Sequence, residues 1–490
     1  MRSGRAIRWT VLCGALCAAA AVSLAMDPEV RRKALSADNS DRWAACEPLA
    51  KEGSPEAVKL LLGILRADED LENRDHAAWA CRYLPSDEAV DSLASLAGGN
   101  APPVARSRVA YGLGRTQRPH ALDLLVRTAK ADPSPLVRCE AIEAMRWFAS
   151  SPIALEACKT AARSADVELR ACAVDAAGRL EKGAGRDIVL AAWAESDEGI
   201  RCAALGAMGA DDALAHLAEA AAAKGWRLRA QAVETSLRWR RPACVEVLIG
   251  LVADETPRVA CAALRALRFL SGKEIAPDAE LWRAWWLASR DAWKAPRGNP
   301  NEAAEVPPDP KATRARFQGV EIESDRVAFV IDHSTSMEKA MPSGERRIDA
   351  VRTELQRTLA ALPDGFRANL VTFGEGVRAA FPAARPLTPK VRQAIVAFSE
   401  TAPLEPATHL SGGLLKALDD DSIDTVYLLT DGAPSCGDFV SFTRVRAGAA
   451  RANRTRRIAV HTIGFGVTHE PTREFLRDLA TENGGRSVFR

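Results

Sequence analysis

The stretch RVAFVIDHSTSM, residues 326–337, decides the fold of the C-terminal third of the chain. Its first part is a continuous apolar run, 327–331, which is typical of a central parallel strand buried on both faces. Asp332, Ser334 and Ser336 follow this run directly. In open α/β sheets, ligands bind beyond the carboxyl ends of the strands. These three side chains are therefore candidate ligand-binding residues.

The segments after this stretch alternate between strand and helix patterns. The predicted strands are 327–331, 368–373, 377–381, 425–429, 458–465 and 487–489. Helical periodicity marks the segments 346–362, 390–399, 411–418, 441–452 and 472–482. Such alternation predicts an α/β doubly wound, Rossmann-like domain.

Two more oxygen-bearing side chains are expected at the same edge of this sheet. Asp431 follows the fourth predicted strand, and Thr408 precedes the third predicted helix. Together with Asp332, Ser334 and Ser336 they supply two carboxylates and three hydroxyls. Hard oxygen ligands favour Mg²⁺, Mn²⁺ or Ca²⁺ over zinc or copper. The sequence therefore predicts a divalent-metal site, with Mg²⁺ as the first expectation.

These motifs resemble the metal-ion-dependent adhesion site of von Willebrand factor A (VWA) domains. The resemblance covers residues 320–490 and is carried by FVIDHSTSM (329–337), Thr408, YLLTDGAP (427–434), AVHTIGFG (459–466) and LATENGG (479–485). It implies that Ser334, Ser336 and, in one state, Thr408 bind the metal directly, whereas Asp332 and Asp431 act largely through water. A cation held mainly by neutral hydroxyls keeps much of its charge, so it attracts an acidic side chain of a protein partner.

The sequence also departs from this family. Pro406 and Ala407 precede Thr408 where relatives often have glycines, so a stiffer loop is expected. His333 and His409 could make binding pH-sensitive, but both are expected to be exposed bystanders. The chain stops right after its last strand, so the final covering helix is expected to be missing. A degenerate fold that no longer binds metal remains the alternative.

A 32-residue repeat fills the first half of the chain. Its mark is a series of arginines, whose steps shorten slightly after the fifth: Arg42, Arg74, Arg106, Arg138, Arg170, Arg201, Arg229 and Arg258. A fixed period with two helical stretches per unit predicts a stacked all-α solenoid. PLVRCEAIEAM (135–145) and GIRCAALGAM (199–208) resemble HEAT-like repeats, and the resemblance covers residues 36–275. The arginine is expected to bridge adjacent units through carbonyls or carboxylates.

Two short segments separate the repeats from the α/β domain. Residues 276–295 place Trp282, Trp285, Trp286 and Trp293 on one helical face. This face is either an aromatic binding patch or, as we favour, the cap that covers the last repeat. Residues 296–319 hold five prolines and few apolar residues, which indicates an extended linker.

The cysteines give no sign of a metal site. Those nearest the repeat arginines, Cys139, Cys172, Cys202 and Cys261, are expected to be free and buried, where a thiol behaves as a small hydrophobe. A disulfide framework is the alternative. The absence of a CxxC pair or a Cys/His cluster argues against zinc. For Cys436, outside the repeats, a free surface thiol and an intermolecular link remain open.

The N-terminus and the charge balance bear on location and partners. Residues 1–25 read as a signal peptide, with early arginines, an apolar run over 10–22 and Ser23-Leu24-Ala25 at the end; an uncleaved anchor is the alternative. We therefore expect an exported protein without a membrane span after cleavage. Sixty-six Lys plus Arg against 64 Asp plus Glu gives a net charge of +2, which offers no field for nucleic acid.

Three functions are compatible with these observations. The favoured one is a protein-protein interaction or adhesion module, in which the metal binds an acidic group of the partner and the repeats serve as a scaffold. The second is a structural envelope or surface protein whose metal only stabilises the fold. An enzyme is the third, and it is disfavoured because the chain lacks a GxSxG elbow, a P-loop and a dinucleotide fingerprint. The partner and the oligomeric state stay open.

Overall fold

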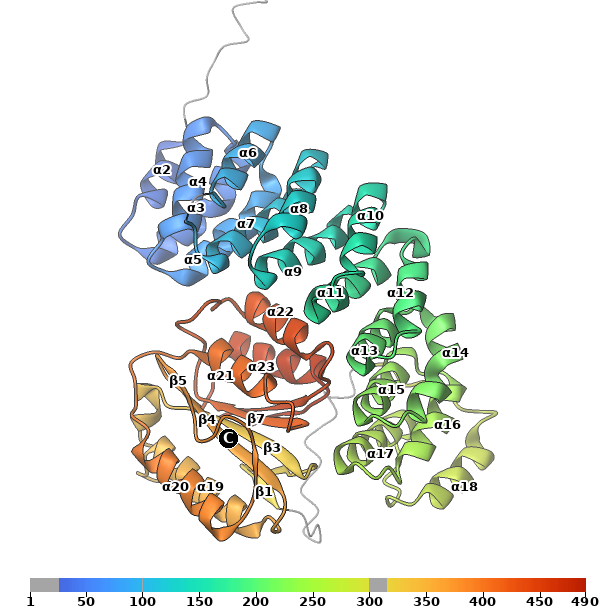
Figure 1. Cartoon of the computed structure of the whole chain (residues 1–490). Helices are drawn as coiled ribbons and strands as arrows, with labels where there is room; N and C mark the ends of the chain where they lie inside the picture. The colour runs from blue at the N-terminus through green and yellow to red at the C-terminus, as the bar shows by residue number, and fades with distance from the viewer. Residues whose placement is uncertain (1–25, 99, 299–314) are drawn as a thin grey trace, which may run out of the picture.

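The structure is a computed structural model that describes residues 26–98, 100–298 and 315–490. A helical solenoid is followed by an α/β domain (Figure 1). The predicted signal peptide, 1–25, and most of the predicted linker lie outside the described residues. Within those ranges, no helix combines the length and the apolar character that crossing a membrane requires.

The solenoid consists of two rows of helices that run side by side, preceded by α2 (Pro28–Ala34). The inner row is α3 (Asn39–Glu52), α5 (Leu71–Ala80), α7 (Pro103–Thr116), α9 (Pro135–Glu143), α11 (Val167–Gly178), α13 (Glu198–Ala207), α15 (Trp226–Trp239) and α17 (Pro257–Ser271). The outer row is α4 (Pro55–Ala67), α6 (Asp87–Ser95), α8 (Pro119–Ala131), α10 (Pro152–Ala161), α12 (Arg186–Trp193), α14 (Ala210–Ala221), α16 (Pro242–Leu251) and α18 (Ala279–Ser289). Many of these helices begin with proline in the first turn or with a side chain that caps their free N–H groups.

The repeat arginines bridge neighbouring units, as expected. The guanidinium of Arg42 bonds the carboxylate of Asp68 at 2.7 Å, and that of Arg106 bonds Asp132 at 2.8 Å. Arg42 also donates to the carbonyls of Ser36 and Ala37. Arg42, Arg106, Arg138 and Arg229 thus tie the start of their own helix to the turn that begins the next unit, whereas Arg74 bonds the Asp68 carbonyl before its own helix.

Arg258 does not belong to this series, contrary to the sequence-based prediction. The bridging arginines are the fourth residues of their inner helices, as Arg229 is in α15. Arg258 is the second residue of α17, so its side chain leaves the helix at a different angle. It matches Arg227 of α15 in position, and it lies close to charged groups of the α/β domain.

The tryptophan-rich helix packs on the last repeat. Trp282 and Trp286 of α18 are buried against the last repeat, and the indole N–H of Trp282 donates to the carbonyl of Ala276 at 3.1 Å. The cysteines of the repeats, including Cys261, are buried. Free thiols are found at Cys46, Cys81, Cys139, Cys158, Cys172, Cys202 and Cys244, and at the partly exposed Cys436.

The α/β domain is built on a sheet with strand order β5-β4-β3-β7-β8-β9. Its strands are β3 (Arg326–Asp332), β4 (Arg367–Phe373), β5 (Val377–Ala379), β7 (Thr425–Thr430), β8 (Ala459–Gly464) and β9 (Ser487–Phe489), with β6 (Arg385–Pro386) beside β4. The pairs β4–β3–β7–β8–β9 are parallel, whereas β5 and β6 run antiparallel to β4. A hairpin of β1 (Arg316–Phe317) and β2 (Val320–Glu321) precedes the sheet, and Phe317 is buried in the core. The domain therefore begins before residue 320.

Helices cover both faces of this sheet and leave its carboxyl edge free for polar residues. One face carries α19 (Arg347–Ala361) and α20 (Pro389–Thr401); the other carries α21 (Leu410–Leu418), α22 (Phe442–Asn453) and α23 (Glu470–Glu482). Alternate residues of β3 enter the two cores, with Phe329 on one side and Val330 on the other. The chain crosses from β4 to β7 over β3, so the end of β3 is the topological switch point.

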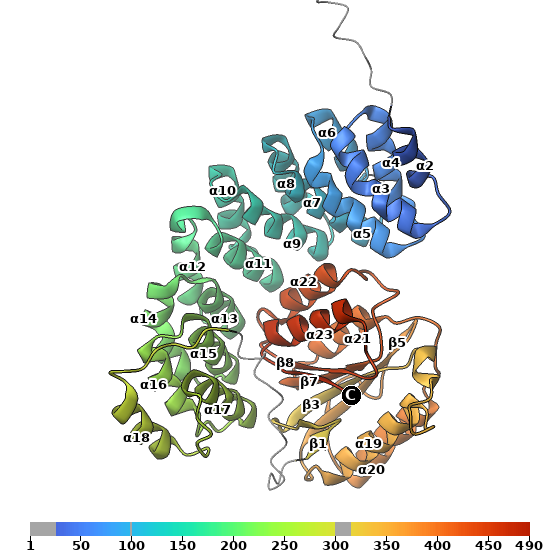
Figure 2. The ribbon, with the colours of Figure 1, turned by 180° about the vertical axis from the view of Figure 1, so that it is seen from behind.

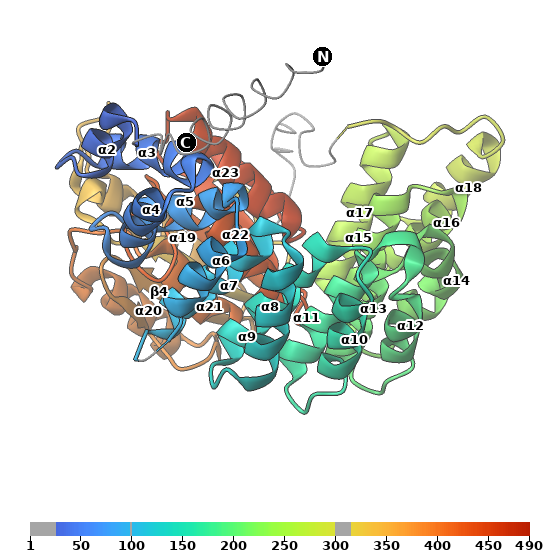
Figure 3. The same ribbon diagram turned by 90° about the horizontal axis from the view of Figure 1, so that it is seen from above.

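The inner row of the solenoid curves around the α/β domain (Figures 1, 2 and 3). At one end, Arg108 of α7 donates to the carbonyl of Asp438 at 2.7 Å, in the loop that follows β7. In the middle, α9 and α11 meet α22. At the other end, Arg265 of α17 pairs with Glu323, just before β3.

A buried cluster of charges fixes the middle of this contact. Glu140 and Glu143 of α9 bond Arg444, Arg451 and Arg454 of the α22 segment; Arg451 lies 2.8 Å from Glu140 and 2.5 Å from Glu143. Burial alone would raise the pKa of Glu143, but the adjacent guanidinium groups hold it below its ordinary value. The carboxylates therefore stay ionised and paired.

Candidate metal centre

Asp332 forms the floor of the predicted site. It ends β3 and is fully buried. Its carboxylate accepts hydrogen bonds from the Ser334 backbone N–H at 2.8 Å and from the Thr430 hydroxyl at 2.6 Å. Burial raises the pKa of Asp332 from 3.8 to about 6, which the hydrogen bonds oppose. Thr430, which the sequence analysis left out of the site, is detectable as the hydroxyl residue that ends the neighbouring strand.

Three of the other predicted residues form a continuous run of hydrogen bonds. The hydroxyl oxygens of Ser334 and Ser336 are 2.7 Å apart, and Ser336 donates to the carboxylate of Asp431 at 2.6 Å. These residues come from segments 95 positions apart in the sequence, and parallel pairing of β3 with β7 brings them together. Four of the five predicted oxygen-bearing side chains thus lie at one edge of the sheet.

Thr408, the fifth, is held beside them through its backbone. Its N–H donates to the Ser435 hydroxyl at 2.9 Å, and the Ser435 N–H donates to the Thr408 carbonyl at 3.1 Å. Ser435 lies four residues after Asp431 in the same loop. In the described part of the chain, no hydrogen bond joins the Thr408 hydroxyl to the other four residues. The Thr408 side chain is largely buried.

Arg347 is a site residue that the sequence analysis missed. Its guanidinium bonds the second carboxylate oxygen of Asp431 at 2.7 Å, and Asp431 is almost fully buried. Arg347 is the first residue of α19, where a cation opposes the helix dipole. A cation at the start of a predicted helix is unfavourable, and this was the feature of the sequence that could have identified Arg347. Arg347 neutralises one of the two carboxylates, so the formal charge of the site is −1 rather than −2.

The expectation that His333 is an exposed bystander was wrong. The side chain is buried, and neither ring nitrogen has a hydrogen-bond partner among the described residues. Burial, with a contribution from Arg352, lowers the pKa of His333 to about 4. The ring therefore stays neutral at physiological pH. His409 is half-buried, with its ring packed against Gly437.

The residues of this edge fit a hard divalent cation. Asp332 is a buried carboxylate to which no cationic side chain of the described ranges is paired, so its charge lacks compensation. Hydroxyl and carboxylate oxygens of the neighbouring residues converge on the same edge. This donor set contains oxygen only, which matches Mg²⁺ or Mn²⁺. Among residues 26–98, 100–298 and 315–490, no cluster of three or more His, Cys, Asp or Glu suited to a metal occurs, at this edge or elsewhere, so the donor set here depends on hydroxyl oxygens.

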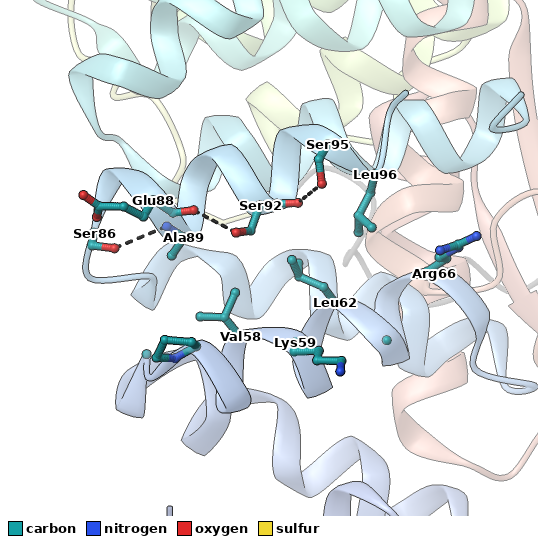
Figure 4. A pocket seen from close by; sticks show the side chains of 13 residues that line it. Val58, Lys59, Leu62, Arg66, Ser86, Glu88, Ala89, Ser92, Ser95 and Leu96 are labelled. Carbon is teal, nitrogen blue, oxygen red and sulfur yellow. Dashed lines mark hydrogen bonds between the residues drawn. The ribbon is translucent and has the colours of Figure 1, made fainter. Parts of the chain in front are cut away.

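A separate cavity of about 510 Å³ lies on the solenoid, between α4 and α6 (Figure 4). Its serines bond within α6: Ser86 accepts from the Ala89 N–H, and Ser92 donates to the Glu88 carbonyl. Val58 and Leu62 of α4 supply the apolar wall. These serines bond to their own helix, and the groove lies at the seam between two outer helices.

Comparison with known families agrees with both parts of the structure. The family described as von Willebrand factor type A domain matches residues 325–489. The family described as HEAT repeats matches residues 28–113 and 96–162. The helix pairs continue beyond the second match, to α18.

Individual relatives match only parts of the chain. Inter-alpha-trypsin inhibitor heavy chain H1 of Bos taurus is 27% identical over 172 residues, which make up 33% of this chain and 18% of that protein. The chain thus spans less than a fifth of this curated relative. A von Willebrand factor type A structure from Catenulispora acidiphila is 22% identical with a TM-score of 0.28, over 34% of this chain and 38% of that one. The CpcE–CpcF complex of phycocyanin lyase from Nostoc is 18% identical with a TM-score of 0.26, over 49% and 92%.

Proposed function

Because the chain consists of HEAT repeats followed by a von Willebrand factor A domain, we propose that it is an exported protein-interaction module whose metal site captures an acidic group of a partner protein. The observation that carries this proposal is the run of oxygens from Ser334 through Ser336 to Asp431, beside the buried carboxylate of Asp332. Its chemistry is binding rather than catalysis.

The side chains have distinct roles in this proposal. Ser334, Ser336 and Thr408 would hold Mg²⁺ directly, and Asp332 and Asp431 would hold it largely through water. When bound, the ion supplies a coordination position for a carboxylate oxygen of the partner.

Arg347 adds to the preference for an acidic partner. Its ion pair with Asp431 removes one negative charge from the edge. A less negative site binds the cation more weakly but leaves more of its positive charge for the partner. The site therefore favours a carboxylate over a neutral oxygen ligand.

The repeats fix the loop that follows β7, next to the carboxyl edge of the sheet. Ser441 and Asp438 of that loop contact Asp75 and Arg108 of the solenoid, whose own ion pair measures 2.7 Å and is buried. A partner bound at the metal edge would therefore meet a site of fixed shape, with the first repeats beside it.

Capture of partner proteins from a surface extract of the source organism tests this proposal. The full chain is immobilised with Mg²⁺, with chelator, or as the variants Ser336→Ala and Ser343→Ala. Ser343 is an exposed serine seven residues from Ser336, and it serves as the matched control. We expect capture by wild type and Ser343→Ala in Mg²⁺ only, and its loss in Ser336→Ala.

If capture is unchanged by the chelator and by Ser336→Ala, the proposal is wrong. If Mg²⁺ raises the melting temperature while capture stays independent of it, the metal stabilises the fold and the structural alternative replaces the interaction module.

A further inference from the structure

A second cavity, of about 490 Å³, lies between the solenoid and the α/β domain. Its walls are α15, α17 and the segment between α23 and β9. This is the amino end of the strands, opposite the metal edge. The charged groups that line it are Arg238, Arg240, Arg258, Arg265, Arg486 and Glu234.

The carboxylates around this cavity do not balance its arginines. Arg265 and Arg486 share a single carboxylate, that of Glu323. Glu234 is paired with Arg457, which lies behind the cavity wall. With Arg457 and Glu323 included, six arginines face two glutamates, a formal excess of four positive charges.

Backbone contacts position Arg240 without neutralising it. Its guanidinium donates to the carbonyls of Pro296 and Gly298, both at 2.9 Å. Carbonyl oxygens satisfy hydrogen bonds but carry no net charge. The positive potential of the cavity therefore remains.

Arg258 is buried in this cavity wall, with its guanidinium 5.6 Å from the centroid of the Trp226 ring. Its side chain is 4% exposed, and its Nε has no hydrogen-bond partner. Within the described residues it forms no ion pair with a carboxylate, and Asp424 and Glu323 act on it only from a distance. Burial lowers its pKa to about 10, so the group is still cationic at neutral pH. A buried, unpaired cation is costly, and a bound anion would remove that cost.

We propose that this cavity binds a small phosphorylated molecule whose phosphate accepts hydrogen bonds from Arg258. The guanidinium fork matches phosphate oxygens, and an excess of four charges suits a multiply charged anion better than a single carboxylate. The volume lies within the range of small-molecule sites, so it holds a phosphate together with the group that bears it. Because both domains line the cavity, the ligand also strengthens their contact.

Titration of the full chain with inorganic pyrophosphate tests the site, in the presence of chelator so that metal binding plays no part. Arg258→Leu removes the buried cation, and Arg283→Leu removes an exposed arginine of α18 as a control. We expect pyrophosphate to bind wild type and Arg283→Leu, and Arg258→Leu to bind at least about tenfold more weakly.

Thermal unfolding without ligand gives a second readout. Arg258→Leu is expected to melt at or above the wild-type temperature, because it removes an uncompensated charge. A large drop would show that Arg258 is a structural ion-pair residue and would overturn the assignment. So would absence of pyrophosphate binding by wild type, unchanged binding by Arg258→Leu, or equally tight binding of citrate.

Discussion

Replacing Arg451 with methionine breaks the buried charge cluster that joins the solenoid to the α/β domain. In the wild type, Arg444, Arg451 and Arg454 pair with Glu140, Glu143 and Asp175, and Asp175 also pairs with the half-exposed Arg179. Arg451→Met removes the guanidinium that bonds both Glu140 and Glu143, whose side chains are less than a tenth exposed. Breaking a buried pair by removing one partner costs about 3–5 kcal/mol. We expect the free energy of domain separation to fall by this amount.

Native-state hydrogen exchange of the amides in α9 and α22 measures this change. Arg446→Met is the matched control, because Arg446 lies on the same helix but pairs with the partly exposed Asp478 and Glu482 of its own domain. Such surface pairs contribute less than about 1 kcal/mol. If Arg451→Met and Arg446→Met lower the protection equally, the cluster does not hold the two domains together.

Three further predictions concern the α/β domain and the cap. Arg347→Met leaves Asp431 without its cation, so the affinity for Mg²⁺ should rise about tenfold in calorimetry; unchanged or weaker binding would exclude the proposed role of Arg347. Burial lowers the pKa of His461 from 6.5 to about 3. Below pH 6.5 this histidine is therefore protonated in the unfolded chain but stays neutral in the folded one. The free energy of unfolding should therefore fall more steeply with decreasing pH in wild type than in His461→Phe, by up to about 1.4 kcal/mol per pH unit. Urea denaturation at pH 5 and 7 measures this difference, and parallel pH profiles of the two proteins would refute it. Trp282→Ala empties a fully buried position of the cap and should destabilise the solenoid by about 3–5 kcal/mol in chemical denaturation, whereas a loss below about 1 kcal/mol would argue against the capping role.

The sheet and four of the oxygen-bearing side chains at its carboxyl edge could be predicted because local patterns encode them. An apolar run followed at once by Asp332 specifies both a buried strand and the place where it ends. The predicted β9, at 487–489, matches the structure, and the other main strands agree within two residues. Parallel pairing then brings Asp431 to Ser336 without any further information.

The contact between the two domains could not be predicted, because in the sequence its charged residues look like those of any solvent-exposed helix face. Glu140 and Arg451 lie 311 positions apart, and only the folded solenoid brings them together. The basic segment from Arg454 to Arg457 is neutralised by Glu143, Asp419 and Glu234. The burial of His333 was missed for a similar reason, since it depends on a neighbouring loop near Ala402.

The binding of one divalent ion at the carboxyl edge of the sheet is the claim on which the proposed function rests. Titration of the full chain with Mn²⁺, followed by electron paramagnetic resonance, counts that ion directly. Wild type and Ser343→Ala are expected to bind one Mn²⁺ per chain that Mg²⁺ displaces, and Ser336→Ala is expected to lose it. Failure of the wild type to bind Mn²⁺, or equal binding by Ser336→Ala, would contradict the assignment of the metal site.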